Sequence, residues 1–557
     1  MDEPFENWSE TVTTYPLLTF VPKTVLGIQN VVRYAANNDK RVRCSGHRFS
    51  WSPIFAEDGE ILISLIAPKR ATAVPNVAAI TRSPDSGPNG PELKRIELLP
   101  ERTAQGNGLC RMGASVTNEE LRRWLVDNGD WALPSNTVIA DGTVVGSAST
   151  MSHGAGFQHQ TLADNVRRLE YVDCNGELHV VDDPQDINAI AGSMGMFGVI
   201  THITHEVIPM QYAILNPRKI DVALAIPPID KTEIPEALQQ DWLRTAEADS
   251  RINAAVDEFE RRSANDYYSE WIWFPYQQRV WTHTWNPSND ATDVRKYPNN
   301  LEVLRQWLEN WAGTAISTSP ILGGLPDRWE AELIGKTGMN TLPPFGLQDR
   351  QPTIVTTLPD ALHHRRGISN MPLHNLEFEI PLPPRADDPS KPDFTIARRA
   401  WWDVIKLVYE YEDSAPLRLA MEMRIMGGSD ALLAPQRGNT LGTVAIGIGS
   451  TINADRDGQW REFCQRVVDA WSASAAEAGG RQPLNLRPHW AKVWTGLRMF
   501  GRPIEEYVRE VAFADQIAEF KDAMAYIGRR HEYGLEDAQA RFSNPLWDQV
   551  IYGGMMG

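Results

Sequence analysis

The sequence predicts an α+β protein with at least two domains. Its 557 residues exceed what one compact core usually holds. Up to about residue 210 the pattern is one of short strands and helices joined by glycine-rich segments. After a proline-rich stretch, longer aromatic-rich strands and helices follow. We therefore place one boundary near residue 210 and a second near residue 485, where we expect the chain to return to the first domain.

Composition and charge narrow the classes of partner. The residues are 42% apolar and 23% charged, as in ordinary globular proteins. The net charge of −18 argues against nucleic acid and anionic membranes, because both attract clustered Lys and Arg. A neutral small-molecule substrate fits better than a highly charged anion, unless a local basic pocket overrides this. The four cysteines are scattered without a C-x-x-C pair, so we expect no metal site and no disulfide framework.

The N-terminus, MDEPFENWSETV, lacks the basic start and apolar run of a signal peptide. No stretch approaches the roughly 18 to 20 apolar residues of a membrane span. We therefore expect a cytoplasmic protein, monomeric or homodimeric, with no membrane partner; a processed secreted form stays open.

Local signals predict the elements of the first domain. An apolar stripe predicts a helix over 22–38, and short strands are expected at 41–44 and 60–65. The Pro-, Gly- and Ser-rich stretch 82–94 is typical of an exposed loop.

Turn and cap signals locate three more elements. Thr117 and Glu120 have the spacing of a capping box, which with Gly129 predicts a helix over 118–128. VRRLEYVDCNGELHVV predicts a hairpin with Asn-Gly at its turn, and VITHITHEVIP alternates as a strand does. In the second half, helical patterns lie near 301–316, 396–412 and 458–478, and a loop is expected at 381–394.

The segment SGHRFS ends the strand predicted at 41–44 in a tight turn. Backbone N–H groups of such a turn can cradle a pyrophosphate without basic side chains, and Gly46 allows close approach. The imidazole of His47 is a competent nucleophile when neutral. A single histidine after a glycine is otherwise usually a turn residue, so both interpretations stay open for this segment alone.

A second glycine-rich segment, GTVVGSASTMSHGAG, runs from Gly142 to Gly156. Its small side chains, hydroxyls and backbone N–H groups suit a loop wrapped around phosphates and sugar-like hydroxyls. It lacks the Gly-Lys-Ser/Thr ending of a P-loop. The alternative is a turn that merely lets two strands pack closely.

Polar residues of the second half form a third candidate group. Glu422 and Arg424 share one face of the predicted strand MEMR, where they could bracket a polar ligand or simply form an ion pair. His489 could orient a substrate hydroxyl or hydrogen-bond within the core. Lys492 could stabilise negative charge on a cofactor ring, or lie on the surface as most lysines do.

In order and spacing, SGHRFS, GTVVGSASTMSHGAG and SMGMFGVITHITHEV resemble the FAD domain of the vanillyl-alcohol oxidase superfamily. Within it, the chain is similar to the aldonolactone oxidase and alditol (xylitol) oxidase branch. FENW near the N-terminus, the strand HNLEFEIP, MEMR and the later RPHWAK resemble motifs of that branch. The resemblance covers most of residues 5–210 and 370–495.

The resemblance implies a fold of two parts and a site between them. Residues 1–210 would form a two-subdomain FAD-binding unit of the PCMH type, and 211–484 a cap with a large antiparallel sheet and flanking helices. Residues 485–557 would return to the FAD unit. FAD would be bound covalently through His47, and the catalytic residues on the substrate side of its ring would be Glu422, Arg424, His489 and Lys492. The remaining implied FAD contacts are Ser45, Gly46, Arg48, Phe49, Ser50, Gly142, Gly146, Ser147, Ser149, Thr150, Ser152, His153, Gly156, Gly198, Val199, Ile200 and Lys492.

The implied reaction is hydride transfer from a polyol or sugar-lactone carbon to flavin N5, with reoxidation by O2 to give H2O2. Alternatives are a dehydrogenase with another acceptor, a flavin-binding protein without catalysis, and a carbohydrate-binding protein built on the 19 tryptophans. Arg48 stands where the branch usually has Ser, and Met151-Ser152 replace small residues. Residues 211–370 match poorly and are expected to shape the substrate pocket, so the substrate does not follow from the resemblance.

Overall fold

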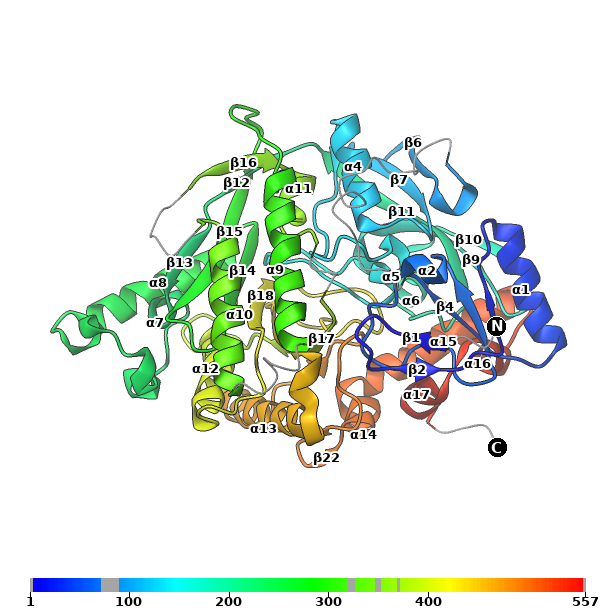
Figure 1. Cartoon of the computed structure of the whole chain (residues 1–557). Coiled ribbons are helices and arrows are strands. Elements are labelled where there is room, and N and C mark those ends of the chain that lie inside the picture. The colour runs from blue at the N-terminus through cyan, green and yellow to red at the C-terminus, as the bar shows by residue number, and fades with distance from the viewer. Residues whose placement is uncertain (1–3, 72–89, 319–325, 346–351, 368–370, 554–557) are drawn as a thin grey trace.

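The computed structural model describes residues 4–71, 90–318, 326–345, 352–367 and 371–553. These residues form an α+β fold with principal sheets of three, six and nine strands. In Figure 1 the first 210 residues lie on the right and the nine-stranded sheet on the left, with the last helices below the first half. The predicted α+β class is confirmed.

Two sheets build the first half. Three parallel strands lie in the order β3-β5-β4, with a helix after the first: β3 (Leu18–Phe20), α1 (Val25–Asn37), β4 (Val42–Ser45) and β5 (Ile61–Ser64). The second sheet is antiparallel, in the order β10-β9-β11-β7-β6, with β8 also on β11: β6 (Ile96–Arg102), β7 (Gly108–Gly113), β8 (Trp131–Ala132), β9 (Val166–Val172), β10 (Leu178–Val181) and β11 (Val199–Pro209).

Most local predictions in this half are confirmed. The helix α4 (Asn118–Asn128) has the capping box of Thr117 and Glu120, and Gly129 ends it with a φ of 74°. The predicted hairpin is β9 with β10, and Gly176 at its turn has a φ of 78°.

The predicted loop 82–94 falls partly outside the described residues. Its last part is not an exposed loop, because residues 92–94 form a short 3-10 helix and Leu93 is 1% exposed. Leu93 packs so closely on Gly113 that a Cβ there would lie 2.3 Å from the Leu93 carbonyl. This contact with β7 buries a residue that composition alone placed at the surface.

The second half contains the large sheet. Its strands run antiparallel in the order β16-β12-β15-β14-β18-β19-β17-β20, with β13 also on β15. The strands are β12 (Tyr212–Leu215), β13 (Arg218–Asp221), β14 (Tyr268–Trp273), β15 (Arg279–Ser288), β16 (Ile354–Thr357), β17 (Leu373–Pro381), β18 (Ala420–Met426), β19 (Thr443–Thr451) and β20 (Arg487–Pro488).

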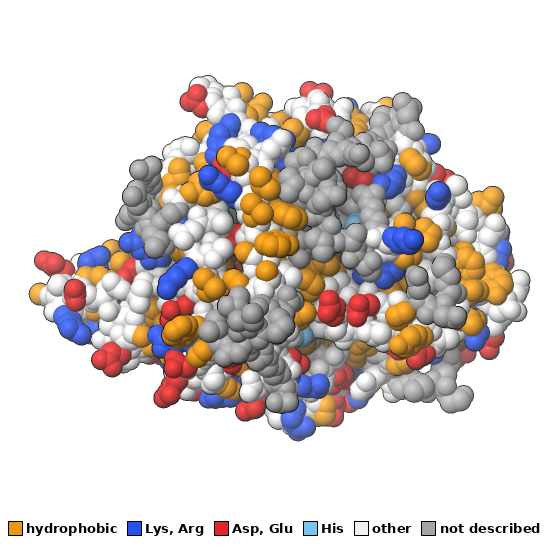
Figure 2. Space-filling view, viewed as in Figure 1, with side chains coloured by type: hydrophobic (Ala, Val, Ile, Leu, Met, Phe, Trp, Pro, Cys, Tyr) orange, Lys and Arg blue, Asp and Glu red, His pale blue; other side chains and the backbone are white. Residues whose placement is uncertain are grey.

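Helices flank this sheet, and the three predicted ones are confirmed. The flanking helices are α8 (Ala248–Asn265), α9 (Asn300–Thr318), α10 (Asp327–Thr341), α11 (Leu358–Leu362), α12 (Thr395–Glu410) and α13 (Gln459–Gly479). The three predicted from the sequence are α9, α12 and α13. The helices α12 and α13 pack together, and Trp471 Nε1 donates to the Ala400 carbonyl at 2.9 Å. Figure 2 shows hydrophobic side chains along the outer face of α9, where Leu308 and Trp311 are exposed.

The last helices pack against the first half. They are α15 (Ala514–Arg530), α16 (Leu535–Phe542) and α17 (Pro545–Trp547), and they contact α6 (Pro184–Ile190) and β4. Arg41 pairs with Asp548 at 2.8 Å, and Arg43 donates to the Phe542 carbonyl at 2.6 Å. The predicted domain division, with its return to the first domain near residue 485, stays a prediction. None of the described helices is long and apolar enough to cross a membrane.

Candidate active site

A cavity of about 290 Å³ lies where the first half meets the large sheet. His47, directly after β4, lines it together with the loop that contains α5 (Val144–Ser149). Glu422 and Arg424 of β18 line it from the large sheet, and His489 and Lys492 from the segment after β20. The fold thus gathers every predicted site residue except Gly156 around one space.

The cavity wall that the first half contributes consists largely of small residues and carries several hydroxyl groups. The Ser45 hydroxyl is buried and has no hydrogen-bond partner among the described residues. The Ser147 hydroxyl accepts from Asn118 Nδ2 at 3.2 Å, which leaves its own proton for an acceptor in the cavity. A Cβ on either Gly46 or Gly146 would lie 2.7 Å from Thr143 Oγ1, so a side chain at either position would force Thr143 to shift. Such a wall fits the pyrophosphate and ribityl chain of FAD.

The two arginines of this wall are already engaged. Arg43 makes four hydrogen bonds to three backbone carbonyls, which use all but one of the N–H donors of its guanidinium. Arg48, in the left-handed region with a φ of 62°, places its guanidinium 4.5 Å from the Phe5 ring centre and donates to the Glu6 carbonyl. Arg48, the residue that departs from the branch, therefore contacts the N-terminal segment through Phe5 and Glu6.

Gly156 does not line the cavity, and its contact with FAD stays a prediction. Its N–H donates to the Ile425 carbonyl of β18 at 2.7 Å. A Cβ at Gly156 would lie 1.9 Å from the Tyr267 carbonyl. This glycine lets the loop of the first half pack closely against the large sheet.

Glu422 and Arg424 form an ion pair with each other and also line the cavity. The two interpretations from the sequence, a structural ion pair and a pair that brackets a ligand, are therefore compatible. Arg424 Nη2 donates to Glu422 at 2.8 Å, and Arg424 Nε donates at 2.8 Å to Glu270 of β14. Burial alone would raise the pKa of Glu270, but Arg424 and His364 hold it well below the usual range. Glu422 has a side chain 36% exposed and remains accessible from the cavity.

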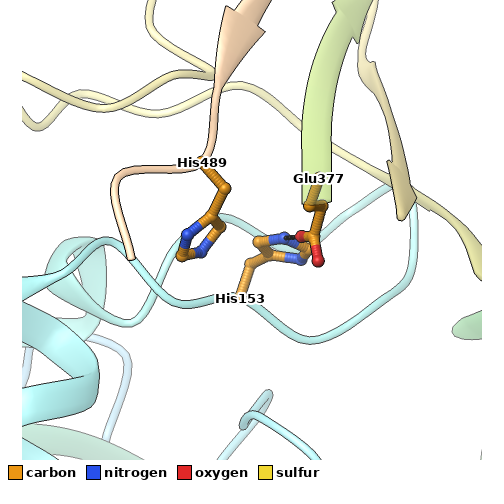
Figure 3. Close-up of side chains that lie close together, drawn as sticks. All are labelled: His153, Glu377 and His489. Carbon is orange, nitrogen blue, oxygen red and sulfur yellow. Dashed lines mark hydrogen bonds and ion pairs between the residues drawn. The ribbon is translucent and has the colours of Figure 1, made fainter. Parts of the chain in front are cut away.

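His153 lies between His489 and Glu377 (Figure 3) and is surrounded by acceptors. Its Nε2 is 2.9 Å from Glu377 and 3.2 Å from Glu379, while Nδ1 is 2.9 Å from the Gly154 carbonyl. Because carbonyl and carboxylate oxygens accept hydrogen bonds, this geometry favours a proton on both ring nitrogens. Burial would lower the pKa of His153, but the two carboxylates outweigh it and raise the pKa to about 10.

Lys492 and His489 complete this side of the cavity. Lys492 Nζ lies 3.3 Å from the second oxygen of Glu377 and 4.5 Å from the Trp51 ring centre, so it is not a surface lysine. His489 Nδ1 accepts from the Ala491 N–H at 3.2 Å, which puts the proton of a neutral ring on Nε2. Burial lowers the pKa of His489 to about 3, so the ring is neutral at physiological pH.

His153, Glu377 and His489 have donor types that suit a metal, and their ligand atoms lie within 4.8 Å of one another. Both oxygens of Glu377, however, already face cations, and both nitrogens of His153 face acceptors. These contacts account for the cluster as a buried ion-pair network.

Sequence reasoning missed three carboxylates of the site: Glu270, Glu377 and Glu379. The alternation in HNLEFEIP puts Glu377 and Glu379 on one face of β17, a signal that could have found them. Glu270 lies in the poorly matching region, and only the pairing of β14 with β18 brings it to Arg424.

Known proteins support the cofactor but differ in activity. The model of an FAD binding domain matches residues 93–182. A D-arabinono-1,4-lactone oxidase of Debaryomyces hansenii is 28% identical over 39% of this chain and 36% of its own length. An L-gulono-1,4-lactone dehydrogenase of Mycobacterium tuberculosis is 22% identical over 38% and 42%. An L-gulonolactone oxidase of Bos taurus is 20% identical over 50% of each chain. The chain spans less than half the length of the first curated relatives it matches, 45% and 36%.

Solved structures match over nearly the whole chain. The cholesterol oxidase of B. sterolicum has a TM-score of 0.63 and 13% identity, covering 98% of this chain and 96% of its own. A solvent-stable cholesterol oxidase has a TM-score of 0.65 and 14% identity, covering 97% of both chains. At this identity the likeness describes the fold. The family model and the lactone-enzyme relatives show that the chain carries an FAD-binding domain of the PCMH type, as in the vanillyl-alcohol oxidase family, and is a distant homologue of the aldonolactone oxidases and dehydrogenases.

Proposed function

We propose that the protein is an FAD-dependent oxidase of a sugar-like alcohol, an alditol or an aldono-1,4-lactone. The observation that carries this proposal is the shared cavity, which joins His47 and the small-residue loop to Glu422, Arg424, His489 and Lys492. FAD bound there would supply the redox chemistry, accepting a hydride at N5 and passing electrons to O2 to give H2O2.

The polar residues divide the work of binding the alcohol. Glu422 presents an accessible carboxylate that accepts the hydrogen bond of a substrate hydroxyl. Arg424 is fixed between Glu422 and Glu270, so its remaining donors are held in place for a substrate oxygen. Neutral His489, with its proton on Nε2, donates to another oxygen.

The cations of the site stabilise negative charge. Lys492 is held against Glu377 and the Trp51 ring, and the His153 side chain lies on the other oxygen of the same carboxylate. In a buried site such fixed charges act strongly on charge that develops during reaction. Lys492 is therefore the group we assign to the electron-rich side of the reduced ring.

Covalent attachment through His47 is part of the proposal. His47 follows the end of β4, lines the cavity and stacks on Phe49 with ring centres 6.0 Å apart. The test is acid precipitation of the purified protein. Yellow colour should stay in the pellet of the wild type and move to the supernatant in His47→Ala; free flavin from the wild type would refute the bond.

The acceptor is tested separately, because the relatives include both oxidases and a dehydrogenase. A panel of polyols and aldonolactones should give steady H2O2 in air. Reduction of an electron-accepting dye without H2O2 would favour the dehydrogenase alternative. A flavin that no alcohol bleaches would favour a binding protein without catalysis.

A further inference from the structure

Arg365 differs from the other arginines of the cavity. Four arginines of the described chain line it: Arg43, Arg48, Arg365 and Arg424. Arg43 and Arg48 donate to backbone carbonyls, although the Nε of Arg48 is also buried without a partner among the described residues, and Arg424 is paired with two carboxylates. The Nε of Arg365 is buried without a hydrogen-bond partner among the described residues. Its nearest carboxylate oxygen, on Glu309, lies 3.8 Å from Nη2, which is longer than a hydrogen bond.

Glu309 does not satisfy this guanidinium. Its other oxygen already accepts from the Thr341 hydroxyl. Burial raises the pKa of Glu309, despite the opposing effects of Arg365 and Thr341. Arg365 therefore has no carboxylate within hydrogen-bond distance among the described residues, and its Nε is unpartnered on a side chain only 14% exposed.

The position of Arg365 is on the substrate side of the cavity. It follows α11, and the preceding His364 places Nε2 3.3 Å from Glu270. Glu270 in turn accepts from Arg424. The acidic residues of this wall, Glu270 and Glu422, are both paired with Arg424, so their repulsion of an anion is reduced.

We propose that Arg365 binds a carboxylate on the substrate, so that the alcohol oxidised here is a polyhydroxy acid of the aldonic type. This inference rests on the proposed function of the same site, and it replaces the neutral alditol or lactone named there with the corresponding acid. A guanidinium offers parallel N–H donors that match the two oxygens of a carboxylate, and a buried cation without a partner gains from an anionic ligand. The net charge of −18 favours neutral substrates in general, but Arg365 is the local basic group that overrides this.

The test compares two ligands with the same carbon skeleton, D-gluconate and D-sorbitol, which differ in a carboxylate against a hydroxymethyl group. Each is titrated into the FAD-loaded enzyme at constant ionic strength, and binding is followed by flavin absorbance and by calorimetry. Gluconate should bind about tenfold or more tightly than sorbitol, since a hydrogen-bonded charge pair contributes that much. Arg365→Met should abolish the preference, and Arg365→Lys should keep part of it.

The matched control is Arg305→Met on α9. The Arg305 guanidinium lies 4.9 Å from the Phe345 ring centre and does not line the cavity, so the gluconate preference should persist. Equal binding of both ligands by the wild type, or a preference that survives Arg365→Met, would overturn the inference. Because ligand binding by calorimetry and flavin reduction by absorbance are separate readouts, gluconate bound through Arg365 to an enzyme whose flavin no alcohol reduces would refute only the proposed function. Reduction by sorbitol without any gluconate preference would refute only the role of Arg365.

Discussion

Glu377 holds two cations at once, His153 through one carboxylate oxygen and Lys492 through the other. His153 also pairs with Glu379, a second buried carboxyl. Burial raises the pKa of Glu379. A buried network of this kind is stable only while its charges balance. The protonation of His153 is therefore the feature on which this part of the site depends.

We expect the stability of the protein to fall as pH rises through about 10. The pKa of His153 is raised above its ordinary value, so its contribution is complete below about pH 6.5 and is lost as the ring deprotonates near pH 10. Between pH 7 and 10.5 the wild type should lose on the order of 2 kcal/mol more unfolding free energy than His153→Gln. Denaturant unfolding at each pH measures this difference.

The control for His153 is His374→Gln. The pKa of His374 is lowered, chiefly by burial, so that ring is already neutral throughout this pH range and its variant should follow the wild type. A direct measurement is NMR of the protein labelled with 15N at histidine, which should show both nitrogens of His153 protonated at pH 8. A His153 ring that titrates near pH 6.5 would contradict the network as described.

At the scale of elements, α4 and α11 connect the first half to the second. Arg122 of α4 is 3% exposed and pairs with Glu119 and with Asp360 of α11. Arg366, just beyond α11, returns to Glu119 at 2.8 Å. Removing one member of such a buried network leaves other charges without partners, and this is more costly than the net value of the pair.

Arg122→Met should therefore lower the free energy of unfolding by about 3 to 5 kcal/mol. The matched control is Arg33→Met, because Arg33 pairs with Glu177 at 2.9 Å with side chains 40% and 62% exposed. Arg33→Met should lower the free energy of unfolding by less than about 1 kcal/mol. Chemical denaturation of both variants tests the comparison, and equal losses would show that α4 and α11 are not joined by this network.

Elements were predictable where their signal is local. The limits of α4 follow from Thr117, Glu120 and Gly129, which lie within the chain segment itself. The predicted site residues share a cavity because the family motifs mark the strands that bring them together. Glu377 could not be assigned to its partner, because His153 lies 224 residues away in the sequence. No sequence pattern pointed to Arg365, because its proposed role depends on the lack of a hydrogen-bond partner for its Nε in the folded structure.

At the scale of the whole molecule, three distant parts of the chain enclose the cavity. The first half supplies β4 and the small-residue loop, the large sheet supplies Glu422, and the C-terminal segment supplies Phe542 at the end of α16. Phe542 is 1% exposed, and its carbonyl accepts from Arg43, which also donates to the carbonyls of Ile54 and Met194. The C-terminal segment is therefore expected to contribute to FAD binding as well as to stability.

Phe542→Ala should weaken FAD binding about tenfold or more when measured in a His47→Ala background, where the flavin can exchange. The loss of a buried ring leaves a space in the cavity wall and costs about 3 to 5 kcal/mol of stability. Phe259→Ala is the matched control: Phe259 is also 1% exposed, but it packs on Trp271 and Phe394 away from the cavity lining. It should lose similar stability and leave the dissociation constant of FAD unchanged, because its ring does not touch the cavity. Fluorescence titration with FAD measures both constants at a temperature where both variants are folded, and equal weakening in the two would mean that Phe542 acts on FAD only through general stability.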